Sequence, residues 1–196
     1  MEIRIVTVGK IKEKYLCDGI AEYAKRLSRY CKLTFCQVAD EKTPDKASEA
    51  LNTQIKNTEG ERLMKHIREQ DYVIALAIDG KTPDSVELSQ KIEKLGVSGI
   101  SSIAFVIGGS LGLSESVLKR ADYKLSFSRM TFPHQLMQMI LLEHIANPGR
   151  IMCKGNRSGL RHDQSGNHGK ERRFAAAART DDCKKFPFRN RKRDIT

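Results

Sequence analysis

Three features that the sequence lacks narrow what the protein can be. It has no run of about 18 apolar residues, which a membrane-spanning helix would need, and no N-terminal signal-peptide pattern. Its five cysteines are odd in number and include no Cys-x-x-Cys pair, so neither a zinc site nor a disulfide framework is indicated. We therefore expect a soluble, cytoplasmic protein with free thiols, no bound metal and no membrane association.

Two phosphate-binding motifs are also missing. Gly80-Lys81-Thr82 resembles the end of a Walker A loop, but the glycine that this motif needs five positions earlier is replaced by Ala75. The dinucleotide fingerprint Gly-x-Gly-x-x-Gly is absent as well, because residues 108–112 read Gly-Gly-Ser-Leu-Gly. The sequence therefore indicates neither a P-loop nor a Rossmann-type dinucleotide site.

The net charge of +11 is concentrated at the end of the chain. From Arg150 to Thr196 there are 14 lysines and arginines against 5 acidic residues, so this segment carries +9 and the preceding residues only +2. A strongly basic chain suggests a nucleic-acid partner, but here the charge mostly describes the last segment. We assign residues 1–147 to one folded domain and residues 148–196 to a basic tail that is either disordered or aberrant, because the apolar periodicity stops at Pro148.

Strand and helix patterns alternate along the folded part. Apolar, β-branched runs predict strands over residues 2–9, 33–38, 71–78, 103–107 and 123–128. Helical spacing of apolar residues predicts helices over residues 14–28, 48–67, 114–120 and 133–145, and another that begins near residue 82. This alternation predicts an α/β fold with a mostly parallel sheet and helices on both faces.

Several local signals refine this pattern. Residues 103–107 carry no charge, which is typical of a strand buried on both faces. Asp79-Gly80 predicts a turn that closes the third strand. Thr82-Pro83 predicts the start of a helix, with Thr82 as N-cap, and Val86, Leu88, Ile92 and Leu95 as its buried face.

Two neighbouring segments are candidates for a ligand site. The glycine-rich residues 108–112 follow a buried strand, and open α/β sheets bind ligands at the carboxyl ends of their strands. The same glycines are equally consistent with an ordinary turn between a strand and a helix. The second segment, Leu-Ser-Phe-Ser-Arg-Met-Thr-Phe-Pro-His-Gln at residues 125–135, combines hydroxyls, aromatic rings and a methionine at a helix start.

The side chains of this second segment allow more than one interpretation. Hydroxyls and backbone N–H groups at a helix start can hold a carboxylate or phosphate, and Phe127, Met130 and Phe132 could enclose an adenine or a thioether. Alternatively, these three residues belong to the core, with the segment's hydroxyls as helix caps. Arg129 is a candidate contact for a phosphate or a ligand carboxylate. His134, on the first helical turn, favours a structural role over a catalytic one.

The two segments together carry a resemblance to a known family. Val-Ile-Gly-Gly-Ser-Leu-Gly-Leu at residues 106–113 and Leu-Ser-Phe-Ser-Arg-Met-Thr-Phe-Pro-His-Gln-Leu-Met at residues 125–137 closely resemble the ribosomal RNA large subunit methyltransferase H family. The start of the chain, Ile-Arg-Ile-Val-Thr-Val-Gly-Lys-Ile-Lys-Glu-Lys-Tyr, is similar too. The resemblance covers about residues 1–145, and the members of this family are small SPOUT-class, or α/β-knot, enzymes.

The resemblance implies a fold, a cofactor and a reaction. The sheet would carry a deep C-terminal trefoil knot, and the protein would be a homodimer. S-adenosylmethionine would be bound by Leu76, Gly108, Phe127, Ser128, Arg129, Met130, Thr131 and Phe132. The reaction would be methylation at N3 of a pseudouridine in 23S ribosomal RNA on the assembled ribosome.

The sequence departs from the family pattern after Ile145. Where the family has Tyr-Arg-Ala-Phe, this chain reads Ala-Asn-Pro-Gly at residues 146–149, and the family's terminal Tyr-His-Lys is absent. We therefore assign no catalytic residue, and we keep as an alternative a catalytically impaired S-adenosylmethionine- or RNA-binding protein of the same fold with a basic tail. Our hypothesis for the tail is a translated wrong reading frame or a foreign fusion. A search of the other two frames of the encoding DNA for the missing motifs tests the reading-frame explanation.

Overall fold

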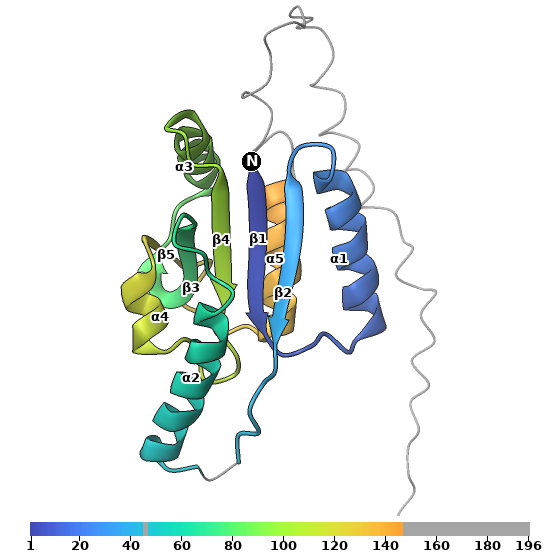
Figure 1. Cartoon of the computed structure of the whole chain (residues 1–196). Coiled ribbons are helices and arrows are strands. Elements are labelled where there is room, and N and C mark those ends of the chain that lie inside the picture. Colours follow the sequence, from blue (N-terminus) through green and yellow to red (C-terminus); the bar gives the residue numbers. More distant parts are fainter. Residues whose placement is uncertain (45–46, 147–196) are drawn as a thin grey trace, which may run out of the picture. The chain divides into compact units, whose positions relative to one another are not determined.

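Five parallel strands form one sheet in the computed structural model, which describes residues 1–44 and 47–146 (Figure 1). The strands are β1 (Glu2–Val8), β2 (Lys32–Val38), β3 (Tyr72–Lys81), β4 (Ser102–Ile107) and β5 (Tyr123–Leu125), in the spatial order β2-β1-β4-β3-β5. Because neighbouring strands in the described ranges pair in parallel, their carboxyl ends lie along one edge, at the bottom of Figure 1. The tail predicted at residues 148–196 lies outside the described residues.

Helices pack on both faces of this sheet, which confirms the predicted α/β class. They are α1 (Lys14–Leu27), α2 (Glu49–Met64), α3 (Ser85–Val97), α4 (Glu115–Arg120) and α5 (His134–Ala146). One apolar cluster joins α1, α3 and α5 to one face, and a second joins α2 and α4 to the other. None of the helices in the described part of the chain is long and apolar enough to cross a membrane.

The central strand β4 anchors the edge of the sheet that carries the candidate site. Every residue from Ser102 to Ile107 is buried, which confirms the prediction of a strand covered on both faces. Phe105 and Ile107 belong to one apolar cluster, and Val106 belongs to the other. Full burial of such a side chain stabilises the folded state by about 1.5–3 kcal/mol. The loop that follows β4 is therefore attached to a stable part of the core.

The third strand is longer than its sequence pattern predicts. The turn expected at Asp79-Gly80 is wrong, because β3 continues to Lys81 and its pairing with β5 shifts register. A Cβ atom at Gly80 would lie 2.8 Å from backbone atoms of β5, so only glycine lets the two strands approach this closely. The Ser126 N–H also donates a hydrogen bond to the Lys81 carbonyl oxygen at 2.8 Å. This contact ties the end of β3 to the segment that follows β5.

The predicted start of α3 is also wrong. The N-cap is Asp84, not Thr82, and Pro83 therefore precedes the helix. The Asp84 carboxylate accepts the Glu87 N–H at 2.7 Å, and the Glu87 carboxylate accepts the Asp84 N–H at 2.9 Å. This reciprocal capping box satisfies backbone donors that a threonine two residues earlier would leave unpaired.

Two further expectations need correction. Val86, predicted on the buried face of α3, is 57% exposed, whereas Ile92 on that face is buried. The fifth strand is shorter than the predicted residues 123–128. Its continuation bends because the Ser126 hydroxyl donates to the Ser128 carbonyl oxygen at 3.0 Å, an arrangement that competes with strand pairing.

The helix predicted over residues 48–67 is partly a core element. It spans Glu49–Met64 as α2, and one side of it is buried, including Glu59 and Gly60. At Gly60, α2 packs directly against Ser114, the N-cap of α4. Gly60 therefore allows a close contact between α2 and the start of α4.

Gly60→Ala is expected to lower the free energy of unfolding by about 1–3 kcal/mol through overpacking. The added Cβ would overlap Ser114 Oγ and lie 2.8 Å from Ser114 Cβ, and Ser114 is only 2% exposed. Urea denaturation of both proteins measures the difference. Gly96→Ala in α3 is the control, because nothing lies within 4 Å of a Cβ there. Equal denaturation midpoints for Gly60→Ala and the parent chain would contradict the close contact.

Candidate functional site

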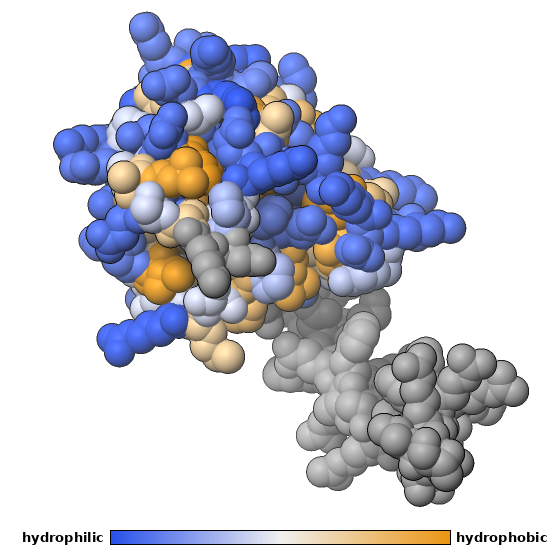
Figure 2. Space-filling view, turned by 90° about the horizontal axis from the view of Figure 1, so that it is seen from below, coloured by the Kyte–Doolittle hydropathy of each residue, from blue (hydrophilic) through white to orange (hydrophobic). Residues whose placement is uncertain are grey.

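A cavity of about 640 Å³ lies at the carboxyl-terminal edge of the sheet, where β3, β4 and β5 end. Figure 2, which faces this edge, shows apolar patches among hydrophilic side chains. The lining residues come from these strand ends and from the two segments singled out by the sequence: Leu76, Ala77, Ile78, Ile107, Gly108, Gly109, Ser110, Leu111, Gly112, Leu125, Ser126, Phe127, Ser128, Met130, Thr131, Phe132, Pro133, His134 and Met137. Ligands of open α/β sheets bind in crevices at this position.

One wall of the cavity is the glycine loop, residues 108–112. Gly109 and Gly112 form an isolated antiparallel bridge, in which the Gly112 N–H donates to the Gly109 carbonyl oxygen at 3.1 Å. Gly112 has a φ of +88°, a conformation that side chains disfavour. A Cβ at Gly108 would lie 2.7 Å from the Gly112 carbonyl carbon. The loop therefore closes on itself so tightly that its first position has no room for a side chain.

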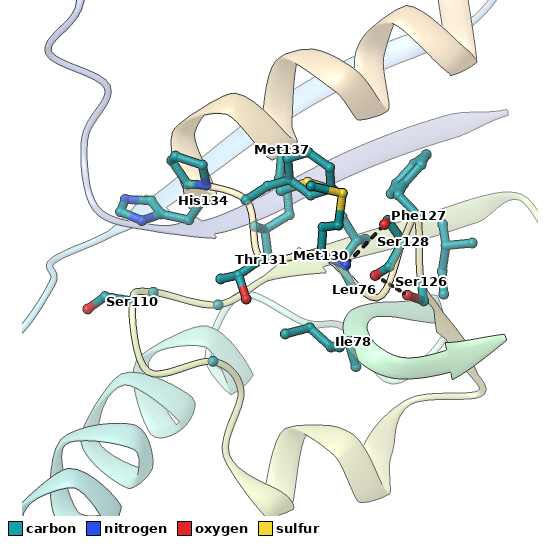
Figure 3. Close-up of a pocket in the computed structure, with 18 of the residues that line it drawn as sticks. Leu76, Ile78, Ser110, Ser126, Phe127, Ser128, Met130, Thr131, His134 and Met137 are labelled. Carbon is teal, nitrogen blue, oxygen red and sulfur yellow. Dashed lines mark hydrogen bonds between the residues drawn. The ribbon is translucent and has the colours of Figure 1, made fainter. Parts of the chain in front are cut away.

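The opposite wall is the segment between β5 and α5. Its turn is held by Ser128, whose hydroxyl oxygen accepts the Met130 N–H at 3.0 Å, while its carbonyl oxygen accepts the Ser126 hydroxyl (Figure 3). The Phe127 ring stacks on His144 of α5, with ring centroids 5.3 Å apart. The Phe127–His144 contact holds the segment against α5, and hydroxyl, thioether and aromatic groups of the segment line the cavity.

The structure brings most of the predicted cofactor-binding residues together. Leu76, Gly108, Phe127, Ser128, Met130, Thr131 and Phe132 all line this one cavity. Arg129 does not line it, and its side chain is exposed. Whether these residues bind a ligand stays a prediction. A shared binding site requires that they lie around one cavity, and these residues from three separate stretches of chain do so.

Several lining residues were not predicted as site residues. Ile78 lies beyond Leu76 on β3 and is 58% exposed (Figure 3). The sequence predicts a turn just after Ile78 and gives no sign that this residue lies exposed at the mouth of a cavity. Met137 lies one helical turn into α5, where an apolar residue is most simply explained as core. A search for apolar residues at the carboxyl end of each predicted strand would have found Ile78, the last residue of the strand predicted over residues 71–78.

His134 also lines the cavity, but its ring points toward the loop after β1 (Figure 3). A Cβ at Gly9 in that loop would lie 3.2 Å from His134 Nε2. Burial lowers the pKa of His134 below its ordinary value, and the nearby Asp40 carboxylate only partly opposes this. A neutral ring packed on the β1 loop fits the structural role that the sequence favours.

The chain is similar to known proteins over most of its length. A family model described as "Predicted SPOUT methyltransferase" matches residues 1–153. Ribosomal RNA large subunit methyltransferase H of Bifidobacterium adolescentis is 63% identical over 151 residues, which cover 77% of this chain and 95% of that protein. The proteins of the same name from Alkaliphilus oremlandii and Clostridium botulinum strain Kyoto are 59% and 58% identical over 78% of this chain and 96% of each relative. Residues 154–196 lie outside the family match.

Proposed function

The chain belongs to the SPOUT methyltransferase family, and on this basis we propose that it methylates large-subunit ribosomal RNA with S-adenosylmethionine as methyl donor. The names of its relatives support the RNA substrate. The observation that carries the proposal for this chain is the cavity in which the glycine loop faces the segment after β5.

The residues present fit this cofactor. Because Gly108 has no side chain, the loop can fold back on Gly112, and residues 108–112 line the cavity, where their main-chain N–H and carbonyl groups would be available to polar groups of a ligand. Phe127, Met130 and Phe132 offer apolar surface for an adenine ring, and Ser128 and Thr131 offer hydroxyls. A volume of about 640 Å³ lies within the usual range of about 300–1,000 Å³ for small-ligand sites.

The protein's part in such a reaction is mainly positioning. When bound, S-adenosylmethionine supplies an electrophilic methyl group, so the transfer depends largely on alignment with the nucleophile. The glycine loop and the segment after β5 would hold and orient the cofactor, and the apolar lining would exclude water. The exposed Arg129, just outside the cavity, would contact an RNA phosphate. We assign no proton acceptor among the described residues.

Finer features of the family are part of the same proposal. We propose methylation at N3 of a pseudouridine in 23S ribosomal RNA, on the assembled ribosome in the cytoplasm. We also propose a homodimer with a composite site, and a trefoil knot formed by the chain around the glycine loop and the segment after β5. The position of these two segments at one sheet edge supports the proposed knot region.

Isothermal titration calorimetry with S-adenosylmethionine tests the cofactor site. We expect saturable binding with one site per chain, and competition by S-adenosylhomocysteine, because both ligands share the adenosine and amino-acid groups. Absence of binding by a chain with a cooperative thermal transition would overturn the assignment. Transfer of labelled methyl groups to ribosomes that lack the modification then tests the reaction.

The alternative function is binding without catalysis. It is favoured by the sequence after Ile145, where the family's Tyr-Arg-Ala-Phe and terminal Tyr-His-Lys are replaced and a +9 segment follows. Binding of S-adenosylmethionine without methyl transfer would support this alternative. A parallel assay on a chain that carries the family's C-terminal sequence would show whether that departure is the cause.

A further inference from the structure

A buried carboxyl group lies beneath the glycine loop. Glu59 is only 4% exposed, and it lies on the side of α2 that otherwise buries Ile55, Gly60 and Leu63. Glutamate is almost never fully buried unless it is paired. Glu59 does not line the cavity, yet the loop that it touches does.

The contacts of Glu59 link three parts of the chain. Its Oε1 accepts the N–H of Glu41, in the loop after β2, at 3.0 Å. A Cβ at Gly109 would lie 2.9 Å from Glu59 Oε2 and 3.3 Å from Oε1, and 3.2 Å from Val8 Cγ1. Gly109 is therefore enclosed between the carboxyl group and the end of β1. Glu59 Oε2 has no hydrogen-bond partner within the described residues.

The surroundings of Glu59 disfavour the ionised form of its carboxyl group, so burying this group lowers the stability of the fold. Burial raises the pKa of Glu59. The hydrogen bond from Glu41 N–H opposes this, the carboxylates of Asp40 and Glu41 add to it, and Arg62 of α2 partly offsets it. Arg62 itself pairs with the Glu41 carboxylate and also donates to the Ala39 carbonyl oxygen. An apolar residue at position 59 would avoid the burial of an incompletely paired polar group.

We propose that Glu59 is a positioning residue of the cofactor site, whose carboxyl group holds Gly109 and thereby sets the shape of the glycine-loop wall. The inference rests on the proposed function for the identity of the ligand, S-adenosylmethionine. The contact with Gly109 itself does not depend on that identity. A carboxyl group is suited to this role because one oxygen is fixed by the Glu41 N–H while the flat group packs against a residue without a side chain.

Two substitutions in the full chain separate positioning from stability. Glu59→Leu removes the acceptor and the burial cost, so we expect a thermal midpoint at least equal to that of the parent chain. We also expect its affinity for S-adenosylmethionine to fall about tenfold or more, because small displacements of a binding wall have large effects. Glu59→Gln keeps the shape and the acceptor, so it should bind within about threefold of the parent chain. Glu61→Gln, at an exposed position on the same helix, is the matched control.

Hydrogen–deuterium exchange of the glycine loop supplies a test that needs no ligand. We expect faster exchange at residues 108–112 in Glu59→Leu, and parental rates in Glu59→Gln and Glu61→Gln. If the parent chain does not bind S-adenosylmethionine, the proposed cofactor fails while the exchange result still decides the role of Glu59. Parental affinity or parental loop exchange in Glu59→Leu would overturn the inference, and so would binding by Glu59→Gln as weak as that of Glu59→Leu.

Discussion

Gly108→Ala is expected to weaken S-adenosylmethionine binding by about 100-fold or more while the chain still folds. The added Cβ would lie 2.7 Å from the Gly112 carbonyl carbon and 2.8 Å from its oxygen, so the glycine loop would have to open. Displacement of a binding wall by about 1 Å is enough for an effect of this size. Titration calorimetry measures the affinity, and the thermal midpoint shows that the domain remains folded.

The control for Gly108→Ala is Gly96→Ala. Gly96 lies within α3, and nothing lies within 4 Å of a Cβ built there. Because alanine favours helix over glycine by about 0.5–1 kcal/mol, this variant should be slightly more stable and bind normally. If Gly108→Ala bound as tightly as Gly96→Ala, the glycine loop would not form the wall of the cofactor site.

Asp71→Ala is expected to lower the free energy of unfolding by about 3–5 kcal/mol, because it leaves a buried arginine without its counter-ion. The Asp71 carboxylate accepts hydrogen bonds from Arg4 Nη1 at 2.8 Å, Ser102 Oγ at 2.7 Å and the Arg68 N–H at 2.9 Å. It joins residues of β1 and β4 to the start of β3, at the edge of the sheet remote from the cavity. A loss of this size is a large part of a typical total of about 5–15 kcal/mol.

The pH dependence of Asp71→Ala follows from the same contacts. Burial opposes ionisation of Asp71, but the hydrogen bonds from Ser102, Arg68 and Arg4, with the charge of Arg4, outweigh it and lower the pKa of Asp71. A lowered pKa means that the carboxylate stabilises the fold above its unfolded pKa of about 3.9, and that this contribution is lost as the pH falls through the folded value. The stability gap between the parent chain and the variant should therefore narrow in acid.

Urea denaturation between neutral and acidic pH measures the loss and its pH dependence. Asp18→Ala, at an exposed position on α1, is the control and should change stability by no more than about 0.5 kcal/mol. Folded Asp71→Ala should bind S-adenosylmethionine normally, because the residue does not line the cavity. A loss near that of the control would show that the Arg4 charge is compensated in another way.

Much of the architecture could be predicted from short-range patterns. The uncharged run at residues 103–107 predicted β4, and the amphipathic spacing around Ile20 and Leu27 predicted α1, whose buried side carries those residues. Such patterns are reliable because they reflect the periodicity of one element against one environment. The resemblance carried by residues 106–113 and 125–137 also identified two segments that meet at the cavity.

Other features could not be predicted because they depend on contacts between distant residues. The extension of β3 through Gly80 needs the backbone of β5 beside it, which a turn-forming dipeptide does not reveal. The exposure of Arg129 outside the cavity depends on the turn fixed by Ser128. Local sequence indicated a turn at Asp79-Gly80, and the tertiary structure overruled it. A ligand contact by Arg129 stays a prediction.

The sequence by itself determined the alternation of strands and helices, the family resemblance and the two segments that form the candidate site. Only the tertiary structure decided that Glu59 lies under Gly109 and that Asp71 meets Arg4. The physical reason is that periodicity records whether a position faces the core, but not which partner it meets there. Glu59 interrupts the apolar pattern on the buried side of α2, and only the tertiary structure shows that the glycine loop lies against it.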